Sequence, residues 1–335
     1  MIKVEGLTKR YARHLAVDHI SFEVEKGQIV GFLGPNGAGK TTTMRVLTCF
    51  MPPTSGTASV AGFDVLEQPM EVKKRIGYLP ETPPLYPDME VAEYLEFVGR
   101  LKGIPKAQLE SRIDEVARKC AVDDVKNKLI GKLSKGYRQR VGLAQAIIHN
   151  PDVLILDEPT AGLDPHQIIE TRDLIKGLAG DHTIILSTHI LPEVEQICER
   201  VIIIAKGKLV ATDTVENLTS RLRGAETVSV EVTSRQGDLN PLQVQAKLEQ
   251  VSGVSRVIHK DSHDGRIHYT VESLQGRHIR PELARAVVES GWDLNELHAV
   301  GLSLEEIFLE LTGANREEAL KAGAATQEVP AGESK

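Results

Sequence analysis

The stretch "GPNGAGKTT", Gly34 to Thr42, restricts the fold of this 335-residue chain more than any other feature. It follows an aliphatic run, "IVGFL" at 29–33, and precedes an apolar run with helical spacing. Strand, loop and helix in this order form the context that a phosphate-binding P-loop requires. The glycines let backbone N–H groups point at phosphate oxygens, Lys40 reaches the terminal phosphates, and the Thr41 hydroxyl suits Mg²⁺. A solvated glycine-rich turn is the alternative, but the complete motif favours a nucleotide site.

Other aliphatic runs occur at 153–156, 183–186 and 201–204. Continuous β-branched or aliphatic runs are typical of strands that are buried on both faces of a parallel sheet, with helical crossovers between them. Near the N-terminus, Phe22 and Val24 alternate with polar residues, which predicts a half-exposed strand. The sequence therefore predicts an α/β core.

Residues 88 to 150 have helical spacing instead. We expect Asp88 to be the N-cap of the first helix there. Two apolar stripes follow at intervals of three and four, and they consist of Val91, Leu95, Val98 and Leu101, and of Ile113, Val116 and Cys120. These patterns predict a helical subdomain over about 88–150, inserted into a first domain of residues 1–220.

A second domain is predicted over 221–312, after the polar stretch "TSRLRGAET". Its pattern has a strand around Val230, a helix at 241–251, a strand pair at 254–259 and 265–271, a second helix and a strand at 293–299. The order βαββαβ fits an α+β ferredoxin-like sandwich, and Ser303 with Glu306 is expected to cap one more helix. Residues 313–335 are poor in bulky apolar residues, so we expect a disordered tail.

Composition narrows the possible partners. The net charge is −7 and no long basic run occurs, so we expect no nucleic-acid partner. Three scattered cysteines suggest neither a disulfide framework nor a zinc site. No apolar run approaches the ~18 residues of a membrane span, so we expect a cytosolic chain. Any function at a membrane would need spans from another protein.

The stretch "VLILDEPTAGLDP" at 153–165 ends a buried strand in two adjacent carboxylates. Such carboxylates repel each other unless a cation lies nearby, and Asp157 is placed to join a Mg²⁺ shell. Glu158 can orient or deprotonate a water that attacks the γ-phosphate. A strand that merely opens into a capped turn is the alternative, which the nearby P-loop disfavours.

These motifs, with "LSKGYRQRVGLAQAII" at 133–148 and "STH" at 187–189, occur in one fixed order. Over residues 1 to about 220 the chain resembles the ATP-binding subunits of ABC transporters. The resemblance implies a P-loop NTPase core of the ABC type, with a parallel sheet, an antiparallel β subdomain and a helical subdomain. It also implies ATP and Mg²⁺ as cofactors, and a homodimer that closes head to tail over two ATP molecules.

The resemblance implies roles for individual residues. Tyr11 matches the aromatic that stacks on adenine, and Ser134 with the Gly136 backbone would contact the ATP of the partner subunit. Asp164 lies in the loop that crosses the dimer interface, and His189 would lie at the γ-phosphate. The nucleotide-binding set is completed by Gly34, Pro35, Asn36, Gly37, Ala38, Gly39, Lys40, Thr41 and Thr42. The implied catalytic residues are Lys40, Glu158 and His189, and the implied metal-binding residues are Thr41, Asp157 and Glu81.

The chain departs from the family pattern at three positions. The usual signature is LSGGQ, whereas Lys135 replaces the first of its paired glycines and Tyr137 replaces its Gln. Lys135 either attracts phosphate or, as we prefer, is solvated. Glu81 stands where the family has a loop Gln. A carboxylate accepts from water or approaches Mg²⁺, but it cannot donate as an amide does.

Three functions are compatible with these motifs. The preferred one is the energising subunit of an exporter, peripheral on the inner face of the membrane beneath a separate multi-span permease. The resemblance extends less specifically to subunits of drug, polysaccharide or gliding-motility permeases. The second is a soluble ABC ATPase acting on ribosomes or DNA, and the third is a core that binds ATP without turnover. Intact Lys40, Asp157, Glu158 and His189 argue against the third.

Overall fold

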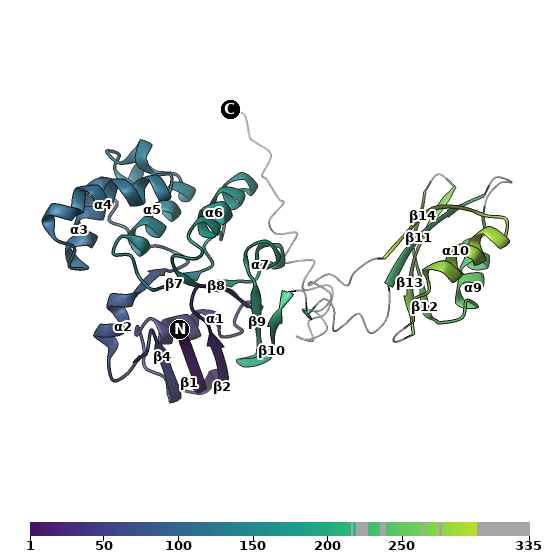
Figure 1. The fold of residues 1–335 in the computed structure, drawn as a ribbon, viewed down its shortest axis with the longest axis horizontal. Coiled ribbons are helices and arrows are strands. Elements are labelled where there is room, and N and C mark those ends of the chain that lie inside the picture. The colour runs from purple at the N-terminus through teal and green to yellow at the C-terminus, as the bar shows by residue number, and fades with distance from the viewer. Residues whose placement is uncertain (216, 219–226, 235–238, 264, 275–276, 300–335) are drawn as a thin grey trace. The chain divides into compact units, whose positions relative to one another are not determined.

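The computed structural model describes residues 1–215, 217–218, 227–234, 239–263, 265–274 and 277–299. The described residues divide into two compact units, one within residues 1–215 and one within residues 217–299, and both are drawn in Figure 1. The predicted boundary at residue 220, the helix expected after Ser303 and the tail at 313–335 lie outside the described residues.

The first unit contains a six-stranded sheet in the order β10-β9-β3-β8-β7-β6. Its strands are β3 (Ile29–Leu33), β6 (Ile76–Leu79), β7 (Val153–Asp157), β8 (Thr183–Thr188), β9 (Arg200–Ala205) and β10 (Lys208–Thr214). All pairs are parallel except β9 with β10. Every residue of β3, β7 and β8 is buried, as expected for aliphatic runs inside a parallel sheet.

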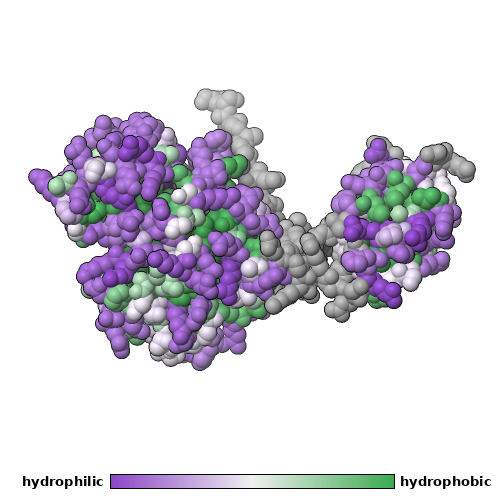
Figure 2. All heavy atoms as spheres, in the orientation of Figure 1, coloured by the Kyte–Doolittle hydropathy of each residue, from purple (hydrophilic) through white to green (hydrophobic). Residues whose placement is uncertain are grey.

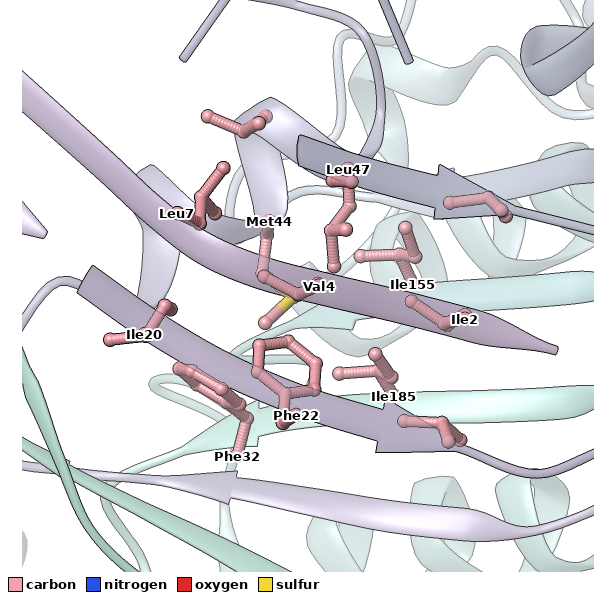
Figure 3. Close-up of a cluster of buried hydrophobic side chains, with 14 of the residues drawn as sticks. Ile2, Val4, Leu7, Ile20, Phe22, Phe32, Met44, Leu47, Ile155 and Ile185 are labelled. Carbon is pink, nitrogen blue, oxygen red and sulfur yellow. The ribbon is translucent and has the colours of Figure 1, made fainter. Parts of the chain in front are cut away.

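A second, antiparallel sheet has the order β2-β1-β4-β5. It consists of β1 (Ile2–Tyr11), β2 (His14–Val24), β4 (Ser55–Val60) and β5 (Phe63–Asp64). Helix α1 (Lys40–Leu47) contacts β2 and β4 of this sheet and β7 and β8 of the parallel sheet. Met44 and Leu47 of α1 lie among apolar side chains from both sheets, as Figure 3 shows. The P-loop helix is therefore held inside the core, so burial fixes the position of its N-terminus.

The helical region contains α3 (Val91–Leu101), α4 (Lys106–Lys119) and α5 (Lys135–Ile147), with short 3₁₀ turns at Asp123–Val125 and Ile130–Lys132. Two details of the prediction were wrong. The N-cap of α3 is Glu90 rather than Asp88, because Glu90 and Glu93 form a reciprocal capping box. Leu101 is 71% exposed, because it ends α3 where no neighbouring element covers it.

Within the described part of this unit, further helices are α2 (Pro69–Arg75), α6 (Pro165–Gly177) and α7 (Leu191–Ile197). Helix α6 follows β7 and α7 follows β8, so both begin near the carboxyl ends of central parallel strands. Loops at this edge of a parallel sheet are the usual place for a ligand site. The described helices include none that is long and apolar enough to cross a membrane. Hydrophilic residues cover most of the face shown in Figure 2.

The second unit has the order βαββαβ: β11 (Thr227–Thr233), α9 (Pro241–Glu249), β12 (Val254–His263), β13 (Arg266–Ser273), α10 (Arg280–Glu289) and β14 (Asp293–Ala299). Its sheet is antiparallel with the order β12-β13-β11-β14. Val228, Val230 and Val232 are fully buried and belong to one cluster with residues of both helices. This is the ferredoxin-like arrangement that the element order predicts, with a core separate from that of the first unit.

Candidate functional site

The P-loop connects β3 to α1 and leaves the N-terminus of α1 open. Gly39 is the N-cap of α1, and no side chain caps the helix there. Its φ of 108° lies in the region that favours glycine, and a Cβ would lie 2.6 Å from the Ala16 carbonyl oxygen. The first backbone N–H groups of α1 therefore have no side-chain acceptor. An uncapped helix N-terminus of this kind, inside a glycine-rich loop, is suited to bind phosphate.

Lys40 is buried at this N-terminus, with 6% of its surface exposed. Its Nζ donates to the carbonyl oxygens of Gly34 and Pro35 at 2.7 and 3.3 Å and lies 3.2 Å from Glu158 Oε1. A buried ammonium requires such partners, because burial without them would favour its neutral form. The loop therefore holds one positive charge next to the uncapped N–H groups.

Asp157 ends β7 beside the P-loop. Its Oδ1 accepts a hydrogen bond from the Thr41 hydroxyl at 3.3 Å and one from Ser187. Burial raises the pKa of the Asp157 carboxyl, although these two hydrogen bonds oppose the shift. Adjacent hydroxyl and carboxylate oxygens are the ligand types that Mg²⁺ prefers. The described residues contain no group of three or more His, Cys, Asp or Glu side chains that could hold a metal.

Glu158 lies between two cationic groups. Besides Lys40 on Oε1, its Oε2 lies 2.8 Å from His189 Nδ1, and the Glu158 side chain is 9% exposed. Burial opposes ionisation, but the His189 hydrogen bond and the Lys40 charge outweigh it and lower the pKa of Glu158. The same hydrogen bond raises the pKa of His189. The φ of Glu158 is +50°, a strained conformation of the kind that clusters at active sites.

Lys40, Thr41, Glu158 and His189 all line one pocket of about 320 Å³. A pocket of this volume is large enough for a small ligand. Ten of the predicted site residues line it: Tyr11, Asn36, Gly37, Gly39, Lys40, Thr41, Thr42, Glu81, Glu158 and His189. Of the other predicted residues, Pro35, Ala38 and Asp157 each adjoin a lining residue in sequence, and Gly34 lies two residues before one, but none of the four lines the pocket. Sequence reasoning missed His14, Ala16 and Ala161, which complete the lining. The pairing of Tyr11 with His14 in the β1–β2 hairpin could have indicated His14.

The remaining predicted residues lie at two other helix starts. Ser134 is the N-cap of α5, and its hydroxyl accepts from the Tyr137 N–H at 3.3 Å. Asp164 is the N-cap of α6 and accepts from the Gln167 N–H at 2.9 Å. A Cβ at Gly136 would lie 2.6 Å from the Gln167 side-chain oxygen, so the two helix starts pack closely. None of Ser134, Gly136 and Asp164 lines the P-loop pocket.

Lys135 and Tyr137, the two residues that depart from the family signature, both have neighbours within the chain. The Tyr137 hydroxyl donates to Asp124 Oδ2 at 2.8 Å, and the Arg140 guanidinium lies 4.3 Å from the centre of the Tyr137 ring. Lys135 is exposed, and its ammonium lies against Gly162, where a Cβ would overlap it. Tyr137 is therefore held in place by its own chain, while Lys135 remains in solvent beside the loop after Glu158.

The profile of the ABC transporter family matches residues 17–161. The bacitracin transport ATP-binding protein BcrA of Bacillus licheniformis is 37% identical over 322 residues, which cover 93% of this chain and 97% of that protein. The Nod factor export ATP-binding protein I of Ralstonia nicotianae is 33% identical over 320 residues, which cover 93% of this chain and 94% of that protein.

A solved structure of an ATP-binding subunit of an ABC transporter is 28% identical, with a TM-score of 0.61. The similar region covers 67% of this chain and 93% of the solved one. The fold of the first unit, the P-loop pocket and the two relatives that match nearly the full length all lead to one assignment. The chain belongs to the ABC transporter family, in which it is an ATP-binding subunit.

Proposed function

We propose that the chain hydrolyses ATP to energise export through a separate membrane permease. The observation that carries this proposal is the convergence of Lys40, Glu158 and His189 on one pocket at the uncapped start of α1. The names of the two relatives, which concern bacitracin transport and Nod factor export, support a transporter that works outward. Both relatives match across both units of this chain, which extends the similarity beyond the ATPase core.

In the proposed reaction the α1 N–H groups and Lys40 bind the terminal phosphates of ATP, and the Tyr11 ring stacks on the adenine. Thr41 and Asp157 would hold Mg²⁺, with Glu81 lining the same pocket as Thr41, and the ion would supply positive charge beside the phosphates. Glu158 is ionised because His189 and Lys40 lower its pKa, so it can accept a proton from the attacking water. His189 holds the Glu158 carboxylate through Oε2, and its other ring nitrogen would donate to the γ-phosphate.

The proposed active form is a head-to-tail homodimer. Ser134, Gly136 and Asp164 lie outside the P-loop pocket, which supports a role for them on the nucleotide of the partner subunit. Ser134 is exposed at the start of α5, where backbone N–H groups can approach an anion from outside the chain. Closure over two ATP molecules would then depend on the γ-phosphate, and hydrolysis would reopen the dimer.

A permease contact is proposed at the aromatic cluster that follows the Glu81 loop. Tyr86 is 52% exposed and packs edge-on against Tyr94 and Phe97, with ring centres 6.0 and 5.8 Å apart. Exposed aromatic side chains are enriched at protein interfaces. Tyr86 follows closely after Glu81, which lines the nucleotide pocket, so a permease bound at this cluster could sense that pocket. The ATPase would then be peripheral on the inner face of the membrane.

Glu158→Gln tests the catalytic proposal. ATP binding should remain, while turnover should fall by about 10²- to 10⁴-fold because the amide cannot accept the proton. ATP should also trap the variant as a dimer, which size-exclusion chromatography detects. Glu67→Gln, an exposed carboxylate change, serves as the control. Normal turnover in Glu158→Gln would refute the role of Glu158 as general base.

Purification from membranes tests the transport proposal. The tagged chain, produced together with the products of its neighbouring genes, should bring down a protein with several apolar spans. The alternative is a soluble ATPase that acts on ribosomes or DNA. That alternative would be favoured if no membrane protein copurified with the chain and if RNA or DNA stimulated its ATP turnover.

A further inference from the structure

Glu193 is a buried carboxylate that none of the roles above uses. It lies in the first turn of α7, and none of its surface is exposed. Its Oε1 accepts a hydrogen bond from the Thr160 hydroxyl, and its Oε2 accepts one from the Thr188 hydroxyl at 2.8 Å. Both threonines are themselves buried, with exposures of 2% and 0%. Each carboxylate oxygen of Glu193 therefore has a fixed partner inside the protein.

These two threonines lie close in sequence to the proposed catalytic pair: Thr160 is in the loop after β7, and Thr188 is the last residue of β8. Thr160 lies two residues after Glu158, and Thr188 directly precedes His189. The Thr188 hydroxyl also accepts a hydrogen bond from the Ile190 N–H at 3.0 Å. This hydrogen bond joins the residue before His189 to the residue after it. Glu193 thus connects the loop after β7 to the loop after β8 at the point where the Glu158–His189 hydrogen bond forms.

Other contacts between these strand ends lie deeper in the sheet. The Glu158 N–H donates to the Ser187 carbonyl oxygen at 2.9 Å, and the Ser187 hydroxyl donates to Asp157. Glu193 adds a cross-link between Thr188, the last residue of β8, and Thr160, three residues after the end of β7. It therefore connects the two segments in addition to the hydrogen bond between Glu158 and His189.

A carboxylate at this position is costly. Burial raises the pKa of Glu193, while the two hydroxyl donors oppose that shift. An apolar side chain would fill the same space without the cost of removing a carboxylate from water, which amounts to several kcal/mol for a charged group. Glu158 has a strained φ of +50°, and such a conformation persists only where surrounding contacts determine it. Glu193 supplies one of these contacts through Thr160.

We propose that Glu193 is a positioning residue for ATP hydrolysis, which holds the loops of Glu158 and His189 together through Thr160 and Thr188. It acts through these two loops and contacts neither nucleotide nor water. This inference rests on the proposed roles of Glu158 and His189.

The test is Glu193→Gln, which keeps the shape but replaces one acceptor oxygen by an NH₂ group. We expect kcat per ATP-binding site to fall by about tenfold, because displacement of a catalytic group by a fraction of an ångström is enough for such a loss. KM and the amount of ATP bound should stay within about twofold, since the P-loop is untouched. Glu195→Gln, an exposed carboxylate change on the same helix, should behave like the wild-type chain.

A second test compares the kcat of a valine and a serine variant at each of the two threonines. Thr188→Val and Thr160→Val remove the hydroxyl at nearly constant volume, so each should reproduce the lower kcat of Glu193→Gln. Thr188→Ser and Thr160→Ser keep the donor and should retain more activity than the valine variants. A role in stability alone would lower the melting temperature without changing kcat per binding site.

The possible outcomes are distinct. Wild-type kcat in Glu193→Gln, or equal losses in the serine and valine variants, would overturn the positioning role. If instead Glu158→Gln itself turns over normally, the proposed role of Glu158 as general base fails, whatever the result at Glu193.

Discussion

Helices α1 and α5 both begin at sites proposed to bind the phosphates of ATP, yet their N-termini differ. Helix α1 begins after Gly39 without a capping side chain, and its start lies in a pocket with Lys40, Thr41 and Glu158. Helix α5 begins after Ser134, whose hydroxyl already accepts one first-turn N–H, and it does not line that pocket. One helix start is thus arranged for a ligand within its own chain, and the other is exposed.

In the proposed head-to-tail dimer, one chain would carry two unequal halves of a site. The α1 half would supply charge, the oxygens proposed to bind Mg²⁺ and the proposed base. The α5 half would supply its helix start and the Ser134 hydroxyl. Changes in the α1 half should therefore affect nucleotide binding by the single chain, whereas changes in the α5 half should affect only the assembled dimer.

Lys40→Ala should have the largest effect. It removes the buried charge at the start of α1 and leaves Glu158 without its lysine partner, so ATP binding should fall by at least about a hundredfold. Isothermal titration with ATP measures this loss. Lys26→Ala, which removes an exposed lysine of the same unit, is the control. ATP affinity near the wild-type value in Lys40→Ala would contradict the assignment of α1 as the primary phosphate site.

Ser134→Arg should leave ATP binding by the single chain unchanged and abolish turnover, because the side chain would block the exposed helix start. Mixed in equal amounts with Lys40→Ala, it should recover about a quarter of the wild-type rate. Half of the dimers would be mixed, and each would contain one complete site out of two. Each variant alone should stay inactive. Absence of recovery in dimers shown to be mixed would refute the shared site.

The sequence predicted the α1 half more fully than the α5 half for a physical reason. The P-loop is a continuous segment whose glycines and Lys40 have fixed spacing, so its geometry follows from local chemistry. The contacts of Tyr137 with Asp124, and of Lys135 with Gly162, join segments that are separate in sequence. No periodicity could indicate them.

The same reasoning explains the other errors. Asp88 is an acceptable N-cap, but the Glu90–Glu93 pair two residues later satisfies two backbone donors instead of one. Leu101 continues the apolar stripe of α3, yet the helix ends there, so no packing surface reaches it. Glu193 has no local pattern at all, because its importance depends on Thr160 and Thr188 meeting at one end of the sheet.

Lys135→Gly restores the usual family residue and should have a smaller effect. An exposed cation near a helix N-terminus changes phosphate binding by a few tenths to 1 kcal/mol, so half-maximal turnover should require about two- to fivefold more ATP at low salt. The difference should disappear at high salt. Lys132→Gly, a nearby exposed lysine change, is the control. A loss larger than about tenfold would mean that Lys135 binds phosphate directly and is not merely solvated.

The smallest expected effect is on the pH dependence of stability. A substitution in the α1 half should change stability by an amount that depends on pH, whereas one in the α5 half should not. The hydrogen bond to Glu158 raises the pKa of His189 above its ordinary value of 6.5, so protonated His189 stabilises the folded chain. That contribution is complete below pH 6.5 and is lost as the pH rises through the raised pKa. Glu158 stays ionised throughout this range, because its pKa is lowered from 4.5.

The difference in melting temperature between the wild-type chain and His189→Gln should therefore shrink as the pH increases. Ser134→Ala changes a helix cap with no titratable side chain, so its difference should remain constant over the same range. If the melting-temperature difference for His189→Gln does not depend on pH, then protonated His189 does not form an ion pair with Glu158. One of the two groups proposed to keep Glu158 ionised would then be ruled out.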